Sequence, residues 1–332
     1  MPPIRARRPV WLPVVVVLGL ALTACGRDSG GAAAGMSGAI NISGSSTVEP
    51  ISALAAEAFH DRDPSVDFAV DGPGTGDGFE LFCDGEIDIS DASRAIEDEE
   101  VATCERHGIE VVELRIGYDG IVVMTNRSND AVECLNFADL YALIGPESDG
   151  VDRWSGATDI ARNLGSDTPL PDAELVLTGP GTESGTYDSF VEIAIEGIAE
   201  ERGLEPTTRT DYASSSDDNV IVATIEGSDT PLGWVGFAFA EEAPETVREI
   251  PIAAEPGGMC VEPTRETIAD GSYPLSRPLF IYVNAGRAEQ GSPLADFVDF
   301  YLANADRFVE EAGYVALPGD QAAETRAAWE AR

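Results

Sequence analysis

Three turns that combine glycine with hydroxyl side chains are the stretches of this sequence best suited to binding chemistry. They are Gly44-Ser45-Ser46-Thr47, Gly72-Pro73-Gly74-Thr75-Gly76-Asp77-Gly78 and Gly179-Pro180-Gly181-Thr182-Glu183-Ser184-Gly185-Thr186. Each follows a strand-like run, and we interpret each as part of a strand–turn–helix unit. The first N–H groups of a helix lack an intrahelical partner, and the helix dipole favours negative charge beside them. The turns therefore predict a cleft for a small oxyanion, formed where helix N-termini converge.

Alternating strand-like and helix-like segments surround these turns and must position them. Strands are predicted at residues 39–43, 66–70, 87–90, 109–114, 121–124, 173–178, 232–239 and 278–283. Helices are predicted at residues 48–59, 97–107, 136–143, 187–199, 217–226, 293–311 and 320–332. This alternation predicts an α/β fold whose sheets are covered by helices. Ligands of such sheets bind beyond the carboxyl ends of the strands, where the turns lie.

Residues 1–25 have the pattern of an export signal. Arginines precede an apolar run at residues 10–22, which is too short to span a bilayer comfortably. The sequence Leu22-Thr23-Ala24-Cys25 then resembles a bacterial lipobox. It predicts a lipoprotein in which Cys25 carries a diacylglycerol and becomes the mature N-terminus, followed by a flexible tether at residues 26–38. The alternative is an ordinary cleaved signal with an incidental cysteine.

The charge of the chain excludes one class of partner. The formal net charge is −40, and all 20 basic residues are arginine. A chain with this balance is not expected to bind nucleic acid or an acidic surface. An acidic surface of this kind would suit a saline habitat, which the sequence does not establish.

The glycine-rich turns do not match the motifs of common enzymes. Ser184 lies in Gly181-Thr182-Glu183-Ser184-Gly185, which is not the Gly-x-Ser-x-Gly motif of a serine nucleophile. The chain has no lysine to complete a nucleotide-binding phosphate loop. The turn at Gly72 lacks the Gly-x-Gly-x-x-Gly spacing of dinucleotide binding. We therefore expect a binding protein without a cofactor, and not an enzyme.

Four cysteines remain after Cys25, namely Cys83, Cys104, Cys134 and Cys260. An even number in an exported chain favours disulfides, and three pairings are possible. Since Cys83 and Cys104 flank one short strand–loop–helix segment, we predict Cys83–Cys104 together with Cys134–Cys260. Zinc is the alternative, but the spacings are wide and the only histidines are His60 and His107, so no metal site is expected.

Several motifs, taken together, resemble those of the phosphate-binding proteins of bacterial phosphate ABC transporters. They are Gly44-Ser45-Ser46-Thr47-Val48-Glu49-Pro50, Asp88-Ile89-Ser90-Asp91-Ala92-Ser93-Arg94, Glu183-Ser184-Gly185-Thr186, Leu232-Gly233-Trp234-Val235-Gly236-Phe237-Ala238-Phe239, the stretch 273–283 and the stretch 314–329. The resemblance runs in order from about residue 40 to the C-terminus. It implies a two-lobed periplasmic-binding-protein fold of type II, with mixed sheets, a hinge and an interlobe cleft.

The resemblance also implies lobe boundaries. The chain would cross between the lobes near residues 116–120 and 276–281. Lobe I would comprise residues 38–117 and 279–332, and lobe II residues 118–278.

The family's ligand residues transfer where the motifs align, and the resemblance implies a phosphate site of Ser46, Thr47, Thr75, Asp91, Ser184, Gly185 and Thr186. In it, Asp91 would accept the hydrogen of a protonated phosphate. Relatives often have an arginine shortly before the Ser-Gly-Thr sequence, and this chain has none there. Arg94 is a candidate replacement that would supply a cationic fork from the other lobe. The alternative is that Arg94 is a structural arginine paired with a nearby acid.

The function that the resemblance implies is binding of inorganic phosphate in the interlobe cleft and its delivery to an ABC transporter permease. The protein would be an exported, lipid-anchored monomer at the outer face of the cytoplasmic membrane. Two alternatives stay open. One is a binding protein for sulfate, molybdate or tungstate, and the other is a lipid-tethered sensor or adhesin that kept the fold without transport.

Overall fold

The computed structural model describes residues 38–182 and 184–332. The predicted export signal, the lipidation site Cys25 and the tether lie outside the described residues, apart from Gly38. The description that follows concerns the compact unit Met36–Arg332, to which the described residues belong. Within the described residues, none of the helices combines the length and the apolar character needed to cross a membrane.

Most strands of the described chain belong to one mixed sheet. The strands are β1 (Gly38–Gly44), β2 (Val66–Asp71), β3 (Ile89–Ala92), β4 (Val111–Asn126), β5 (Leu135–Asn136), β6 (Val176–Gly179), β7 (Ala213–Ser214), β8 (Pro231–Gly236), β9 (Val247–Glu249), β10 (Ile252–Ala253), β11 (Ser276–Asn284) and β12 (Val315–Ala316). The ten-stranded sheet has the order β2-β1-β3-β11-β4-β8-β6-β7, with β9 and β12 also paired to β4. Strand β1 runs parallel to β2 and β3, whereas β11 is antiparallel to β3 and β4.

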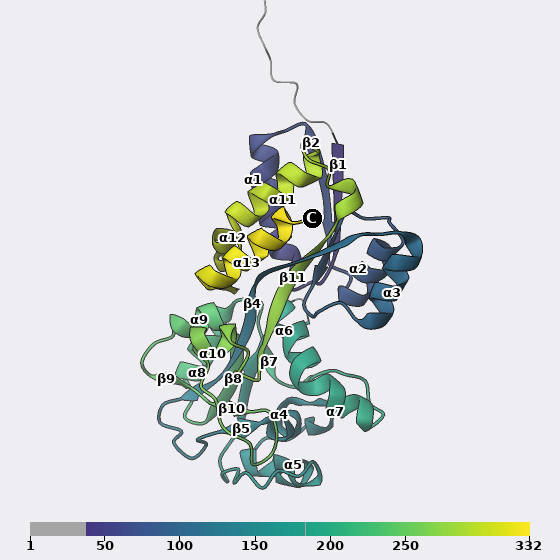
Figure 1. The fold of residues 1–332 in the computed structure, drawn as a ribbon. Helices are drawn as coiled ribbons and strands as arrows, with labels where there is room; N and C mark the ends of the chain where they lie inside the picture. Colours follow the sequence, from purple (N-terminus) through teal and green to yellow (C-terminus); the bar gives the residue numbers. More distant parts are fainter. Residues whose placement is uncertain (1–37, 183) are drawn as a thin grey trace, which may run out of the picture. The chain divides into compact units, whose positions relative to one another are not determined.

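Helices follow most of the strands, as the α/β prediction requires (Figure 1). They are α1 (Glu49–Arg62), α2 (Thr75–Cys83), α3 (Asp98–His107), α4 (Phe137–Ile144), α5 (Thr158–Asn163), α6 (Gly185–Phe190), α7 (Glu196–Glu201), α8 (Asp218–Glu226), α9 (Phe237–Glu241), α10 (Arg265–Ala269), α11 (Pro293–Ala303), α12 (Ala305–Glu311) and α13 (Gly319–Glu330). Short 3-10 turns occur at Pro146–Ser148, Trp154–Ala157 and Ala285–Arg287, and a π turn at Val191–Ile195.

Several predicted elements have different limits in the structure, and three of them end or are interrupted where the prediction continues. The strand predicted at residues 232–239 ends at Gly236, where α9 begins. The helix predicted at 187–199 starts earlier and is interrupted by the π turn between α6 and α7. The helix predicted at 293–311 divides into α11 and α12 at Asn304, whose side-chain amide donates to the carbonyl of Phe300 and so competes with the helical backbone.

One long strand replaces two predicted short ones. Residues 109–114 and 121–124 were expected as separate strands, but β4 runs unbroken for 16 residues. Strand β11 pairs with it from Val111 to Gly120 and keeps the intervening segment extended (Figure 1). The glycines there serve packing: a methyl group on Gly117 would lie 2.8 Å from a Val309 methyl, and one on Gly120 would lie 2.6 Å from Ile268.

Buried apolar side chains form two large clusters and one smaller cluster. The first core draws on residues 40–116 and 279–329 and includes Ile42, Ile51, Phe59, Leu114, Ile281 and Phe297. The second core draws on residues 118–275 and Val315 and includes Val122, Tyr141, Trp154, Phe190, Trp234 and Leu275. A smaller third cluster around Phe79 and Phe82 packs against Phe280 and Tyr282 of β11. Strand β4 thus contributes to both large cores and connects them, whereas the buried side chains of β11 belong to the first core and to the third cluster.

Both predicted disulfides are present. Cys83 and Cys104 are joined and link α2 to α3, and Cys134 and Cys260 are joined. Within the described residues, no group of three or more histidine, cysteine or acidic side chains is arranged to hold a metal ion. The four cysteines are therefore structural crosslinks and not metal ligands.

Candidate functional site

The first two predicted turns pack directly on each other. The backbone N–H of Ser45 donates to the carbonyl of Asp91 (2.9 Å), and that of Gly74 donates to the carbonyl of Gly44 (2.8 Å). Gly44 has a φ of +145°, and a methyl group on it would lie 2.1 Å from the Asp91 carbonyl oxygen. Only glycine fits there, because the backbones approach so closely. A methyl group on Gly78 would likewise lie 2.5 Å from the Cα of Gly44, so the first turn of α2 is held against the end of β1.

The predicted Thr75 lies at the first residue of α2, facing the segment after β3. Its hydroxyl is 3.1 Å from the hydroxyl of Ser93 and accepts a 3.3 Å bond from the Ser93 N–H. Thr75 and Ser93 line a pocket of about 460 Å³ together with Arg94 and with Glu192 from the π turn after α6. The pocket is therefore lined by the turn at the start of α2, by the segment after β3 and by the π turn after α6.

The third turn meets the first. A methyl group on Gly185 would lie 3.4 Å from the Cα of Thr47, so the start of α6 sits directly against the start of α1. The Ser46 hydroxyl donates to the Asp188 carboxylate (2.7 Å), and the hydroxyls of Thr47 and Ser189 are 3.1 Å apart.

The side chain at the start of α6 keeps the turn in shape. The Ser184 side chain accepts a 3.2 Å bond from the N–H of Thr186 and so caps the helix. The predicted residues Ser46, Thr47, Ser184, Gly185 and Thr186 thus gather at one place.

Asp91 lies on β3 directly below these turns and is completely buried. Its Oδ1 accepts a 2.8 Å bond from the hydroxyl of Ser52 on α1. Its Oδ2 is buried and has no hydrogen-bond partner among residues 38–182 and 184–332. Burial raises the pKa of Asp91 to about 8; the Ser52 bond opposes this shift, and the charges of Glu49 and Asp71 add to it. The carboxyl group therefore holds an unused hydrogen-bonding oxygen inside the site.

Arg94 lies in the same pocket wall but is already paired. Its two terminal nitrogens donate to the two carboxylate oxygens of Glu100, at 2.9 Å and 2.7 Å. Glu97 is a further 3.6 Å neighbour, and the guanidinium stacks 5.3 Å from the centre of the Phe79 ring. This arrangement corresponds to the second of the two interpretations given for Arg94, a structural arginine paired with a nearby acid.

A different arginine, which the sequence analysis did not single out, reaches the turns. Arg277 lies on β11, and its Nη2 donates to the hydroxyls of Thr47 (3.0 Å) and Ser189 (2.6 Å). Its Nη1 contacts the carboxylate of Glu192. The available signal was its position within residues 276–281, the stretch expected to cross between the lobes.

Two further side chains complete the surroundings of Arg277. Asp119 is its register partner on β4, and the Arg277 Nε and the Asp119 Oδ2 are 3.6 Å apart. Burial raises the pKa of Asp119, and Arg277 and Ser189 oppose the rise. Tyr314 also approaches, since a methyl group on Gly185 would lie 3.3 Å from its hydroxyl oxygen. Burial raises the pKa of Tyr314 and keeps it a neutral hydroxyl.

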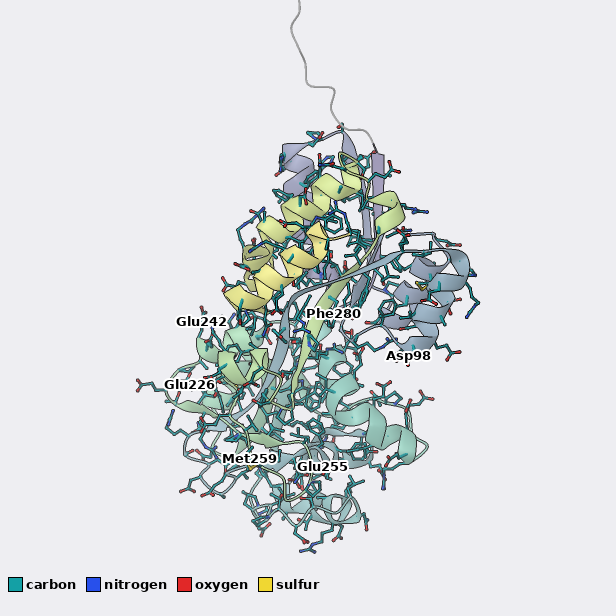
Figure 2. All side chains as sticks on the ribbon, in the orientation of Figure 1. Asp98, Glu226, Glu242, Glu255, Met259 and Phe280 are labelled. Atoms are coloured by element: carbon teal, nitrogen blue, oxygen red, sulfur yellow. A yellow bond between two sulfur atoms is a disulfide. The ribbon has the colours of Figure 1, made fainter. Side chains whose placement is uncertain are left out.

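The large negative charge of the chain is not confined to this site. Asp98, Glu226, Glu242 and Glu255 are exposed and lie on separate segments (Figure 2). With a net charge of this sign, any attraction for an anion has to come from local donors such as the turn N–H groups and hydroxyls, and not from the net charge.

The chain is similar in sequence and in fold to known proteins. The chain matches the model of the PBP superfamily domain over residues 29–305. It is 37% identical over 281 residues to protein SphX of Synechocystis sp., covering 84% of this chain and 78% of that protein. It is 33% identical over 302 residues to the phosphate-binding protein PstS of Staphylococcus aureus, covering 90% of this chain and 85% of that protein.

A solved structure supports the same assignment. A possible phosphate binding protein from Planctomyces limnophilus superposes with a TM-score of 0.79 at 34% identity, covering 89% of this chain and 99% of that one. The mixed α/β fold predicted from the sequence is thereby confirmed. The chain belongs to the periplasmic phosphate-binding protein family, within the PBP superfamily.

Proposed function

We propose that the protein binds inorganic phosphate where its three glycine-rich turns meet. The ligand set is Ser46, Thr47, Thr75, Asp91, Ser184, Gly185 and Thr186, whose hydroxyls and backbone N–H groups are donors suited to an oxyanion. The single observation that carries the proposal is Asp91, a fully buried carboxyl with an unused oxygen beneath these donors. The relatives named as phosphate-binding proteins support the same ligand.

Asp91 gives the site a way to distinguish phosphate from other oxyanions. Monohydrogen phosphate and dihydrogen phosphate each have an O–H to donate, and a carboxylate is a strong acceptor for it. Fully ionised sulfate has no such hydrogen and would face an ionised Asp91 without a bond. A buried group left unpaired in this way is a source of strong discrimination.

We further propose that the bound phosphate is delivered to the permease of a phosphate ABC transporter. The protein would be exported and held at the outer face of the cytoplasmic membrane by acyl chains on Cys25, as a monomer. Lobe I, residues 38–117 and 279–332, and lobe II, residues 118–278, would close around the ligand, because turns from both lobes contribute donors. Membership of the family supports this role.

Two experiments test the proposal. Calorimetric titration of the purified, phosphate-free protein should give saturable binding of phosphate with a stoichiometry of one. Cells that lack the gene should lose phosphate uptake at low external phosphate and regain it with the wild-type gene. Tight binding without restored uptake would limit the function to binding or sensing, and absent binding would overturn the proposal altogether.

A further inference from the structure

We infer that Arg277, on the crossing strand β11, is the cation of the anion site. This inference rests on the proposed function and names the charged residue of that same site. Residues 171–186, which lead into α6, contain no arginine, so this turn supplies no cation of its own. A site that binds an anion among buried carboxyls needs a positive charge, because Asp91 and Asp119 are both desolvated there.

The position of the Arg277 guanidinium carries the inference. Its Nη2 lies 3.0 Å from the hydroxyl of Thr47 at the start of α1 and 2.6 Å from that of Ser189 on α6. The charge is therefore at the junction of the first and third turns. Only 11% of the Arg277 side chain is exposed, so water screens it weakly.

The hydrogen bonds of Arg277 also prepare the hydroxyls as donors. The Thr47 oxygen accepts from Arg277, and a hydroxyl whose oxygen is engaged in this way directs its own hydrogen elsewhere. The neighbouring Ser189 oxygen accepts from the same nitrogen. Because the two hydroxyls also bond to each other, one of their two hydrogens is used between them and the other is left for an anion at the start of α1.

Arg94 is the natural comparison, because it is the other arginine beside these turns. Both of its terminal nitrogens are engaged by the single carboxylate of Glu100, and 38% of its side chain is exposed. Arg277 instead bonds to neutral hydroxyls and to Glu192, whose side chain is 47% exposed. Both arginines have acidic neighbours, since Asp119 also lies 3.6 Å from the Arg277 Nε. The difference is that a carboxylate occupies both terminal nitrogens of Arg94, whereas Nη2 of Arg277 bonds only to neutral hydroxyls and so keeps a charge that a ligand at those hydroxyls can share.

Glu192 therefore competes with the anion for Arg277. It contacts Nη1 and lines the pocket that also contains Thr75. Removing its charge should strengthen anion binding, a result that a purely structural Arg277 would not produce. This gives the inference a test that does not require any change to Arg277 itself.

The experiment titrates phosphate into the full chain, purified in detergent, by calorimetry. Arg277→Gln should weaken phosphate binding on the order of 100-fold, the loss expected for a charged hydrogen-bond donor to an anion. Arg277→Lys should recover part of the affinity, since it restores the charge without the fork. The matched control Arg94→Gln removes the same charge from the pocket wall and should change the affinity by less than about threefold.

Glu192→Gln should tighten phosphate binding by about threefold, as expected for loss of a partly exposed ion pair. Glu200→Gln, on α7, removes the same charge from a residue that makes no hydrogen bond or ion pair with Arg277 in the described structure, and serves as its control. If thermal denaturation shows that Arg277→Gln is not folded, the comparison of Glu192→Gln with Glu200→Gln tests the role of Arg277 instead. Unchanged or weaker binding by Glu192→Gln, or wild-type affinity in a folded Arg277→Gln, would overturn the inference alone. Absence of phosphate binding by the wild type would overturn the proposed function first.

Discussion

Asp91 on β3 and Asp119 on β4 are the same residue type, equally buried, in two different surroundings. Asp119 lies opposite Arg277, and its Oδ2 is 3.6 Å from a guanidinium nitrogen. Asp91 has the hydroxyl of Ser52 as its side-chain partner and a second oxygen without a bond among the described residues. Burial raises the pKa of both. The Oδ2 of Asp119 also lacks a hydrogen-bond partner among the described residues, so the two aspartates differ in the charge beside them. Asp119 has an arginine within ion-pair distance and Asp91 has none there, which is why we propose Asp91, and not Asp119, as the acceptor for the ligand.

The largest expected effect is on ligand choice at Asp91. In the wild type with Asp91 ionised, phosphate should bind more tightly than sulfate on the order of 10⁴-fold, as in sites built to require a hydrogen bond. Asp91→Asn replaces the acceptor with an amide that also donates, so the ratio of the two affinities should fall towards one. Titration of both anions into the variant measures this ratio. A variant that keeps the wild-type ratio would separate Asp91 from selectivity.

Asp119→Asn should act on stability instead. It leaves Arg277 without a buried partner on β4, and breaking such a pair costs about 3 kcal/mol or more of the free energy of unfolding. Urea unfolding monitored by circular dichroism measures the change. The ratio of phosphate to sulfate affinities should stay at its wild-type value, because Asp119 is not the acceptor for the ligand hydrogen. A ratio of affinities near one, together with unchanged stability, would show that Asp119 and not Asp91 is the acceptor for the ligand hydrogen.

The pH dependence of stability should distinguish the wild type from Asp91→Asn. The folded-state pKa of Asp91 is about 8, against an ordinary value of 3.8. Between these values the folded state binds one more proton than the unfolded state, so this group's contribution to stability falls as pH rises. The free energy of unfolding of the wild type, relative to Asp91→Asn, should drop by about 1.4 kcal/mol per pH unit between pH 5 and pH 8. A flat difference over that range would show that Asp91 titrates normally.

The smallest expected effect comes from Ser52. Its hydroxyl donates to Asp91 and lowers the pKa of that carboxyl. Ser52→Ala should therefore raise the Asp91 pKa further, by roughly half a unit to one unit, the equivalent of one hydrogen bond. The midpoint of the pH dependence just described should move upward by that amount. A midpoint that moves downward would contradict the assignment of Ser52 as the partner that favours the ionised form.

The parts of the site that are formed by short, continuous segments could be predicted from the sequence. Glycines and hydroxyls between a strand and a helix mark an N-terminal turn wherever they occur, and the turns containing Ser46, Thr75 and Ser184 were found in this way. Both disulfides followed from the short segment between Cys83 and Cys104. Apart from Cys134 and Cys260, which are 126 residues apart and were the pair left over, these features depend on residues close together in the chain.

Features that depend on distant packing escaped prediction. The sequence predicts separate strands at residues 109–114 and 121–124, but the missing side chains of Gly117 and Gly120 make room for Val309 and Ile268 beside an unbroken β4. Arg277 was overlooked because its partners, Thr47 and Ser189, are 230 and 88 residues away. Arg94 was favoured because it stands three residues after Asp91, and only the fold reveals Glu100 across its guanidinium. Sequence spacing indicates which side chains are near a turn, but not which of them are already paired.

The central claim, that Asp91 selects an anion carrying its own proton, is tested most directly by wild-type calorimetry at two pH values. At pH 9 Asp91 is mostly ionised and phosphate still has one O–H, so phosphate should bind and sulfate should be nearly excluded. At pH 6.5 the neutral acid can donate to either anion, and the ratio of affinities should fall by about tenfold or more, following the ionised fraction of a group with a pKa of about 8. Comparable phosphate and sulfate affinities at pH 9 would contradict the account.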